Sequence, residues 1–453
     1  MKTTKDLYKW ALQLAIPIMI QNLISTLVGT ADTVMLGFVG QTAMSASSLA
    51  NQYIFVLFCM FYGMATATSV MCAQYWGKGD RKTIERIIGL AARVAILFAL
   101  VFTVVSFLFP EMIMRLFTSS VDTIEMGKQY LRVLSISFVF MAISQVYLSA
   151  LRSIGKVAFP SAVAVISLCV NIFFNAAFIF GLFGLPRLGV TGVALGTVIA
   201  RATEMVLCIV YSFRSDIRFR VKYIFAKTGA LKNDFFKISV PSIGNDLVWS
   251  LATSVFAAIM GHMGDDIVAA NAVAIMVVNI GAIAMRGFAN STTIVIGQTL
   301  GANHIEPAKV YARKLVRLTG YVGCVGCIVI VGLRPFIMSF YSNKLSEQAV
   351  AYLGSMMLMT TYRMIGEGIN TCLICGCFRG GGDTKMLMFA DNGFLWALSI
   401  PLGYAAGFIF HWNAFLVYVC LKIDQIVKTV WCIFRLKSGK WIKKIKIAGK
   451  DAE

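Results

Sequence analysis

Charged residues are scarce in this chain. They make up 14% of its 453 residues, whereas soluble proteins carry about a quarter. Hydrophobic residues make up 58%, and the mean hydropathy is +0.77. So little charge cannot cover a soluble surface of this size, and we expect a multi-pass membrane protein. No cleavable signal peptide is expected before the first apolar run.

Histidine is scarcer still, with three residues, which narrows the metal chemistry open to the chain. Most of the 11 cysteines lie in apolar runs, and the metal-like spacings at 324–327 and 372–377 have no histidine nearby. We interpret these cysteines as small apolar membrane residues. Acidic residues number 21 against 41 basic ones, but the basic residues flank apolar runs. This placement favours anionic lipid as the partner of the basic residues and argues against nucleic acid.

Apolar runs of spanning length, about 20 residues each, recur along the whole chain. They are centred on 11–38, 46–75, 84–109, 124–150, 158–182, 190–213, 236–260, 268–298, 311–333, 348–376, 386–410 and 412–435. The sequence therefore predicts twelve transmembrane helices. Eleven is the alternative count, because a very short turn joins the last two runs.

The basic residues also predict topology. With the N-terminus in the cytoplasm, 29 lysines and arginines fall in inner segments and only six in outer ones. This bias predicts a cytoplasmic-membrane protein with both termini in the cytoplasm and an even number of spans.

An internal repeat divides the chain into halves. Identical residues recur at an offset of 224: Pro17 and Pro241, Gly37 and Gly261, Gly40 and Gly264, Gly63 and Gly287, Gln74 and Gln298, Gly77 and Gly301. Because six is an even number of spans, both halves enter the membrane from the same side. The predicted fold is all-α, with twelve transmembrane helices in two pseudo-symmetric six-helix lobes. We expect lobes at 1–213 and 236–435, a basic cytoplasmic linker at 214–235 and a basic cytoplasmic tail at 436–453. Because both halves are fused in one chain, we expect the protein to work as a monomer.

One carboxylate, Asp32, lies inside the first apolar run. A carboxylate within a membrane span is costly, and it persists where it faces water, a cation or a proton path. The repeat places Phe256 at the position equivalent to Asp32, and Asp246 at the position equivalent to Asn22. The halves therefore share a scaffold and differ in their acids, which suggests different roles.

Several motifs resemble the MATE (multidrug and toxic compound extrusion) transporters of bacterial type. They are Pro17 with the segment ADTVMLG at 31–37, QYWGKG at 74–79, RGGGDTK at 379–385, and Asp391 followed by Trp396 and Pro401. The resemblance covers essentially the whole chain. It implies a V-shaped pair of lobes and secondary active multidrug efflux, without a cofactor. Bulky organic cations or drugs would be exchanged for inward Na⁺ or H⁺ by alternating access.

The resemblance also implies a cation-coupling site at Asp32, Asn171, Asn175 and Thr197. Asn171 and Asn175 are four apart and share a helix face. Oxygen ligands suit Na⁺, the one metal ion expected here, whereas burial favours a protonated carboxyl, so H⁺ stays open. Many family members carry Asp-Pro where this chain has Asn175 and Ala176, which leaves Asp32 as the one acid of this predicted site.

Two further acids, Asp246 and Glu367, lie in the seventh and tenth spans. The resemblance implies a substrate-binding or second coupling role for them. Glu367 is four residues after Arg363, and Glu204 is three after Arg201, so each acid is also expected to pair with its arginine.

Two alternatives differ in function. A flippase for lipid-linked oligosaccharides, from the same superfamily, would need a cationic cleft, and few arginines lie within spans. A membrane-embedded prenyl or acyl transferase would need paired acids or a nucleophile. Asp265 and Asp266 are the one adjacent acidic pair, and no third acid follows at useful spacing. We therefore expect a transporter and no enzyme.

Overall fold

The computed structural model describes residues 4–226, 228–342 and 346–443. The first three residues and the tail beyond residue 443, both predicted to be cytoplasmic, lie outside the described residues. Nearly all of the described chain is helical, and no strand occurs within it. The all-α prediction is confirmed.

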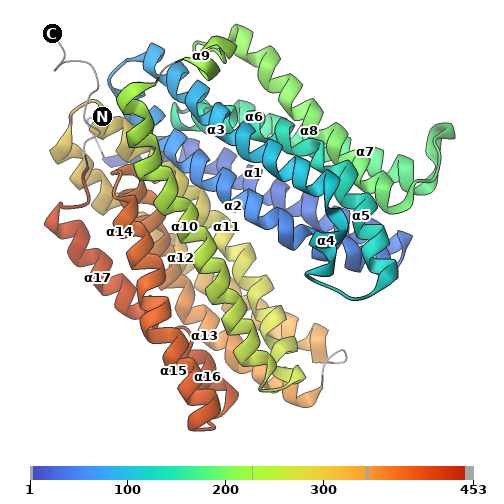
Figure 1. The fold of residues 1–453 in the computed structure, drawn as a ribbon. Coiled ribbons are helices and arrows are strands. Elements are labelled where there is room, and N and C mark those ends of the chain that lie inside the picture. The colour runs from blue at the N-terminus through green and yellow to red at the C-terminus, as the bar shows by residue number, and fades with distance from the viewer. Residues whose placement is uncertain (1–3, 227, 343–345, 444–453) are drawn as a thin grey trace. The chain divides into compact units, whose positions relative to one another are not determined.

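The first half of the chain contains nine α-helices (Figure 1). They are α1 (Thr4–Val39), α2 (Gln41–Gly77), α3 (Arg81–Leu108), α4 (Pro110–Arg115), α5 (Val121–Ser135), α6 (Ser137–Ser153), α7 (Ala158–Phe180), α8 (Gly189–Arg214) and the short α9 (Val221–Phe225). A 3-10 turn, η1 (Leu182–Gly184), follows α7.

The second half begins with three long helices and ends in shorter ones. They are α10 (Gly229–Gly261), α11 (Asp265–Gly301), α12 (Ile305–Ser342), α13 (Glu347–Thr371), α14 (Thr384–Met388), α15 (Ile400–Tyr404), α16 (Ala414–Cys420) and α17 (Asp424–Ser438). Four π-helical stretches interrupt them: η2 (Cys372–Phe378), η3 (Phe389–Gly393), η4 (Leu395–Ser399) and η5 (Ala405–Ile409). Residues 384–409 therefore form one span in which α and π turns alternate.

Each predicted span is occupied by one helix or by successive helices. Within the described residues, nine helices are long and apolar enough to cross a membrane, or ten if α5 and α6, bent by 47° at their junction, count as one span. The α13 span is less apolar because it carries Arg363 and Glu367, and α16 and α17 are individually short. These two regions complete the twelve.

The repeat is visible in the helix boundaries. Helices α2 and α11 both have 37 residues, and their ends are offset by 224. Each begins after a glycine with positive φ, 142° at Gly40 and 128° at Gly264. Residues that have a side chain rarely adopt this backbone conformation, so glycine is required at both turns.

The described residues form two compact units. One holds those up to Met19 and those from Val240 onward, and the other holds Ile20–Ser239. In the first unit, the start of α1 packs on its partners: Leu7 and Ala11 are fully buried, and Lys314 donates to Thr4 at 2.6 Å. The unit boundaries fall inside α1 and α10. The lobe limits predicted at 213 and 236 stay a prediction.

In the unit Ile20–Ser239, α7 packs along α8. A Cβ atom at Gly192 would lie 2.7 Å from the Cβ atom of Phe178, which is closer than side chains approach. Small residues in membrane helices allow this proximity. The close approach brings the polar face of α7 against α8.

The segment between α8 and α10 is docked on α3 and α6. Glu85 of α3 accepts the backbone N–H of Arg218 at 3.0 Å and pairs with the Arg220 side chain at 2.9 Å. Tyr147 of α6 donates to the carbonyl of Ile217 at 3.0 Å. Arg93 donates to the carbonyls of Ile224 and Ala226. The segment therefore has a defined path over its own unit.

Replacing Glu85 by glutamine should loosen this segment. The variant loses the ion pair to Arg220, and the buried amide satisfies the Arg218 N–H less well. We expect trypsin to cleave at Arg218, Arg220 and Lys222 several-fold faster, as measured by limited proteolysis of the purified protein. The matched control is Glu125→Gln, which changes an exposed acid paired with Lys128. Equal cleavage rates in both variants and the wild type would show that Glu85 does not hold the segment.

Candidate cation site

Four polar side chains from three helices form one hydrogen-bonded chain. The Asn175 side-chain nitrogen donates to Asp32 Oδ1 at 2.6 Å and to Asn171 Oδ1 at 3.3 Å. Asn171 in turn donates to the Thr197 hydroxyl oxygen at 3.2 Å. All four residues belong to the unit Ile20–Ser239, on α1, α7 and α8. The structure thus brings together the residues predicted for cation coupling.

The orientation of the Asn175 amide leaves one acceptor unused. A carboxylate only accepts hydrogen bonds, so the amide nitrogen faces Asp32 and the amide oxygen faces away. Asn175 is fully buried, and its Oδ1 atom has no hydrogen-bond partner among the described residues. An unpaired buried acceptor costs about 1–3 kcal/mol. The site therefore holds an oxygen that a donor or a cation would stabilise.

Gly196 of α8 makes room for this oxygen. A Cβ atom at Gly196 would lie 2.1 Å from Asn175 Oδ1 and 3.0 Å from the Asn175 backbone nitrogen. A larger residue at 196 would therefore displace Asn175. Tyr130 of α5, which is buried, adds a hydroxyl that interacts with Ser47, Asn51 and the charge of Asp32.

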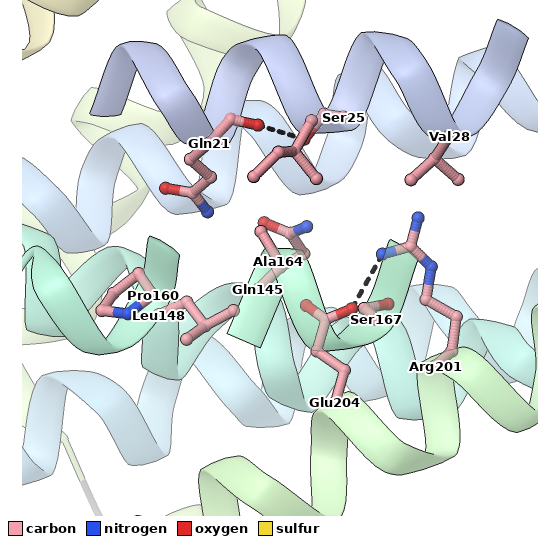
Figure 2. Close-up of a pocket in the computed structure, with 11 residues that line it drawn as sticks. Gln21, Ser25, Val28, Gln145, Leu148, Pro160, Ala164, Ser167, Arg201 and Glu204 are labelled. Carbon is pink, nitrogen blue, oxygen red and sulfur yellow. Dashed lines mark hydrogen bonds and ion pairs between the residues drawn. The ribbon is translucent and has the colours of Figure 1, made fainter. Parts of the chain in front are cut away.

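A cavity of about 70 Å³ lies in the same unit, between α1, α6, α7 and α8 (Figure 2). Its lining includes Gln21 and Ser25 of α1, together with Arg201 and Glu204 of α8. Arg201 and Glu204 pair at 2.8 Å, and the Glu204 side chain is 5% exposed. The predicted pairing of these residues is confirmed.

Asp246 and Glu367, the other predicted acids, belong to the unit that holds the residues from Val240 onward. Asp246 of α10 lies next to Asn245, whose amide donates to Asp391 at 3.2 Å. Glu367 of α13 pairs loosely with Arg363, at 3.8 Å, which confirms that expected pair. No hydrogen bond or ion pair joins Asp246 to Glu367 in the described part of the chain.

Lys428 of α17 is the centre of a buried charge cluster in this unit. Its ammonium lies 3.1 Å from Asp391 and 3.4 Å from Asp424, and the Lys428 and Asp424 side chains are 6% and 1% exposed. Ser399 donates to Asp424 at 3.0 Å. The cluster joins the π-helical stretches η3 and η4 to α17. Such stretches are frequent at functional sites.

A lysine also lies at the position that mirrors the cation site. Phe256 is the repeat equivalent of Asp32, and the Lys422 ammonium lies 4.4 Å from the centroid of the Phe256 ring. Aromatic faces attract cations. The second half therefore places a lysine amine, in place of a carboxylate, at this position.

Replacing Lys428 by methionine should destabilise the unit that holds the residues from Val240 onward by about 3–5 kcal/mol, because the buried Asp424 and the partly buried Asp391 would lose their counter-charge. We expect a lower melting temperature of the purified protein in detergent. The double variant Lys428→Met with Asp424→Asn removes one of the two unpaired carboxylate charges, so part of the lost stability should be regained. A melting temperature unchanged in the single variant would contradict this account.

Sequence reasoning missed Gly196 and Lys428. Gly196 lies directly before Thr197, within the segment GVALGT at 192–197. The signal for Lys428 was its spacing, four residues after Asp424 in an otherwise apolar run. Neither signal names the partners, Asn175 and Asp391, which lie on other helices.

A family model described as MatE matches residues 17–177 and 241–405. A probable multidrug resistance protein NorM from Thermotoga maritima is 25% identical, and the alignment covers 97% of this chain and 94% of the relative. An uncharacterized transporter, YisQ, from Bacillus subtilis is also 25% identical over 94% of each chain.

Solved structures of MATE proteins share the fold. A MATE crystal structure in the bent conformation has a TM-score of 0.86 at 17% identity and covers 96% of both chains. An outward-facing multidrug resistance MATE transporter of the MOP superfamily has a TM-score of 0.85 at 17% identity, over 97% of this chain and 99% of that one. The predicted fold class is confirmed. Since the family model matches most of the sequence and both halves of the repeat, this chain belongs to the MatE family, the multidrug and toxic compound extrusion family of membrane transporters.

Proposed function

We propose that this protein is a secondary active exporter that exchanges organic cations for inward Na⁺ or H⁺. One observation carries the proposal: a carboxylate inside a membrane span, Asp32, is joined to the buried polar groups of Asn175, Asn171 and Thr197. Such an acid is costly unless it binds a cation or a proton. The multidrug resistance names of relatives add support for drug efflux.

The Asn175 amide provides a route to ion binding. With its nitrogen toward Asp32, the amide supplies a hydrogen bond to the carboxylate. If the amide turns over, its oxygen faces the carboxylate instead, and two oxygen ligands then meet at one point. Asn171 and Thr197 lie next to them and offer further oxygens. Oxygen ligands of this kind suit a hard cation, whereas a proton would need only the Asp32 carboxyl.

Ion binding at Asp32 would drive export by favouring one of two conformations. A ligand shifts such an equilibrium only by its difference in affinity for the two states. A bound cation removes the uncompensated charge of Asp32, so a conformation that seals the site becomes less costly. In this proposal the acids Asp246 and Glu367 attract the cationic substrate or form a second coupling site. The protein needs no cofactor, performs no enzymatic reaction, and acts as a monomer in the cytoplasmic membrane with both termini inside.

The test is ethidium efflux from liposomes that contain the purified protein. One set of liposomes carries a Na⁺ gradient and the other a pH gradient. Efflux with the Na⁺ gradient alone would identify Na⁺ as the coupling ion and the four residues as its ligands. Efflux with the pH gradient alone would make Asp32 a proton carrier and leave the two asparagines as its hydrogen-bond partners.

No efflux under either gradient, from protein that melts cooperatively, would overturn the proposal. The flippase alternative would then be tested by rescue of a strain that lacks its own flippase for lipid-linked sugars. A transferase would be tested by turnover of a prenyl or acyl donor.

A further inference from the structure

The cavity and the Asp32 site lie along the same polar helix faces. On α1, Gln21, Ser25 and Asp32 are four and seven residues apart, and on α7, Ser167, Asn171 and Asn175 are four apart. On α8, Thr197, Arg201 and Glu204 are four and three apart. Residues at these spacings share one face of a helix. The cavity lining includes Gln21, Ser25, Ser167, Arg201 and Glu204, so polar groups continue from the cavity to Asp32 on all three helices.

Arg201 extends from α8 across this cavity. Figure 2 shows its guanidinium pointing toward α1 near Val28, one helical turn before Asp32. One of its terminal nitrogens donates to Glu204 at 2.8 Å. A guanidinium has five N–H donors, so the bond to Glu204 leaves others on the side of α1.

Four charges interact in this part of the unit. The charge of Arg201 acts on Asp32, and Glu204 interacts with both Arg201 and Arg152. When Asp32 is ionised, the negative charges of the two acids cancel the positive charges of the two arginines. An arriving cation adds a positive charge that these groups do not offset, so Arg201 opposes its binding.

We propose that Arg201 lowers the affinity of the Asp32 site for its coupling ion, and that Glu204 sets how strongly Arg201 does so. This inference rests on the proposed function, in which Asp32 binds that ion. An exporter must release the ion into the cytoplasm on every cycle, so a site that binds too tightly would stall. In this proposal Arg201 acts through its charge on Asp32 and does not itself bind the ion or the substrate.

The charges give opposite expectations for two single variants. Arg201→Gln removes the opposing charge and should tighten ion binding by roughly tenfold, the scale expected for a unit charge several ångströms away in a partly screened interior. Glu204→Gln frees Arg201 from its partner and should weaken ion binding. Arg201→Lys keeps the charge and should stay close to wild type. The double variant Arg201→Gln with Glu204→Gln removes both charges and should return affinity toward wild type.

The measurement is equilibrium binding of the coupling ion, the one that drives efflux, to the purified full-length protein. For Na⁺ the readout is retained ²²Na⁺, and for H⁺ it is proton uptake from weakly buffered solution. Melting temperatures of all variants establish that each is folded, and Glu204→Gln serves as the test if Arg201→Gln is not. A variant that merely perturbs structure would weaken binding in every case.

The two ideas fail in different ways. If Asp32→Asn binds the ion as well as the wild type, the coupling site of the proposed function is not at Asp32. If Asp32→Asn loses binding while folded Arg201→Gln binds the ion equally or more weakly, the role of Arg201 is wrong and the coupling site stands. If Arg201→Gln does not fold, ion binding by Glu204→Gln that equals or exceeds wild type overturns the inference.

Discussion

Replacing Asp32 by asparagine should abolish ion-driven efflux while the protein still folds. The substitution keeps the shape of the side chain and a hydrogen-bonding group opposite Asn175, and it removes the only charge in the four-residue site. A unit charge in contact with a cation is worth several kcal/mol in a protein interior, so ion affinity should fall by roughly 100-fold or more. Efflux of ethidium from liposomes and equilibrium ion binding measure the two losses.

The matched control is Asp122→Asn, the same chemical change at an exposed acid in the first turn of α5. This control should transport like the wild type. Full ion-driven efflux by Asp32→Asn at equal protein levels would show that coupling occurs elsewhere, with Asp246 and Glu367 as the next candidates.

A second large effect is expected from a change that replaces none of the proposed ion ligands. Gly196→Ala would place a methyl group 2.1 Å from Asn175 Oδ1, inside any allowed contact distance. Asn175 must then move away from α8, and both of its hydrogen bonds lose their geometry. Overpacking of this kind costs about 1–3 kcal/mol. Ion affinity should fall about tenfold or more, because every 1.4 kcal/mol of lost ligand geometry is a factor of ten.

Gly332→Ala in α12 makes the same change where the new methyl group meets open space. Because alanine favours helices over glycine, this control should be as stable as the wild type or slightly more stable. Ion binding and melting temperature are measured for both variants. Wild-type ion affinity in Gly196→Ala would mean that Asn175 does not need its present position, and would remove it from the site.

Much of the fold follows from sequence because two strong signals agree. Long apolar runs mark the spans, and the basic residues between them mark their direction. The repeat could be recognised in the sequence because turns such as those at Gly40 and Gly264 require glycine, so these glycines recur at the same offset in both halves. The π-helical stretches between residues 372 and 409 were not predicted, since a π turn changes the hydrogen bonding of a helix without changing its hydropathy.

The candidate site was predictable only in part. Asp32 is conspicuous as an acid in an apolar run, and the family resemblance supplied Asn171, Asn175 and Thr197. The direction of the Asn175 amide, the space left by Gly196 and the cavity beside Arg201 depend on distances between helices. Such distances leave no trace in the periodicity of one segment. The same holds for Lys428, whose partner Asp391 comes from another helical span.

The lysine held over the Phe256 ring has a consequence for energetics. Of the two positions related by the repeat, one presents the Asp32 carboxylate and the other an aromatic ring that faces the Lys422 side-chain amine. The second position therefore offers a mobile cation no carboxylate and places an amine nearby. If one monovalent ion enters for each monovalent drug cation that leaves, as the proposed exchange with a single coupling site would require, a cycle transfers no net charge across the bilayer. Membrane voltage would then contribute nothing to export, and the pump would draw only on the concentration difference of its ion.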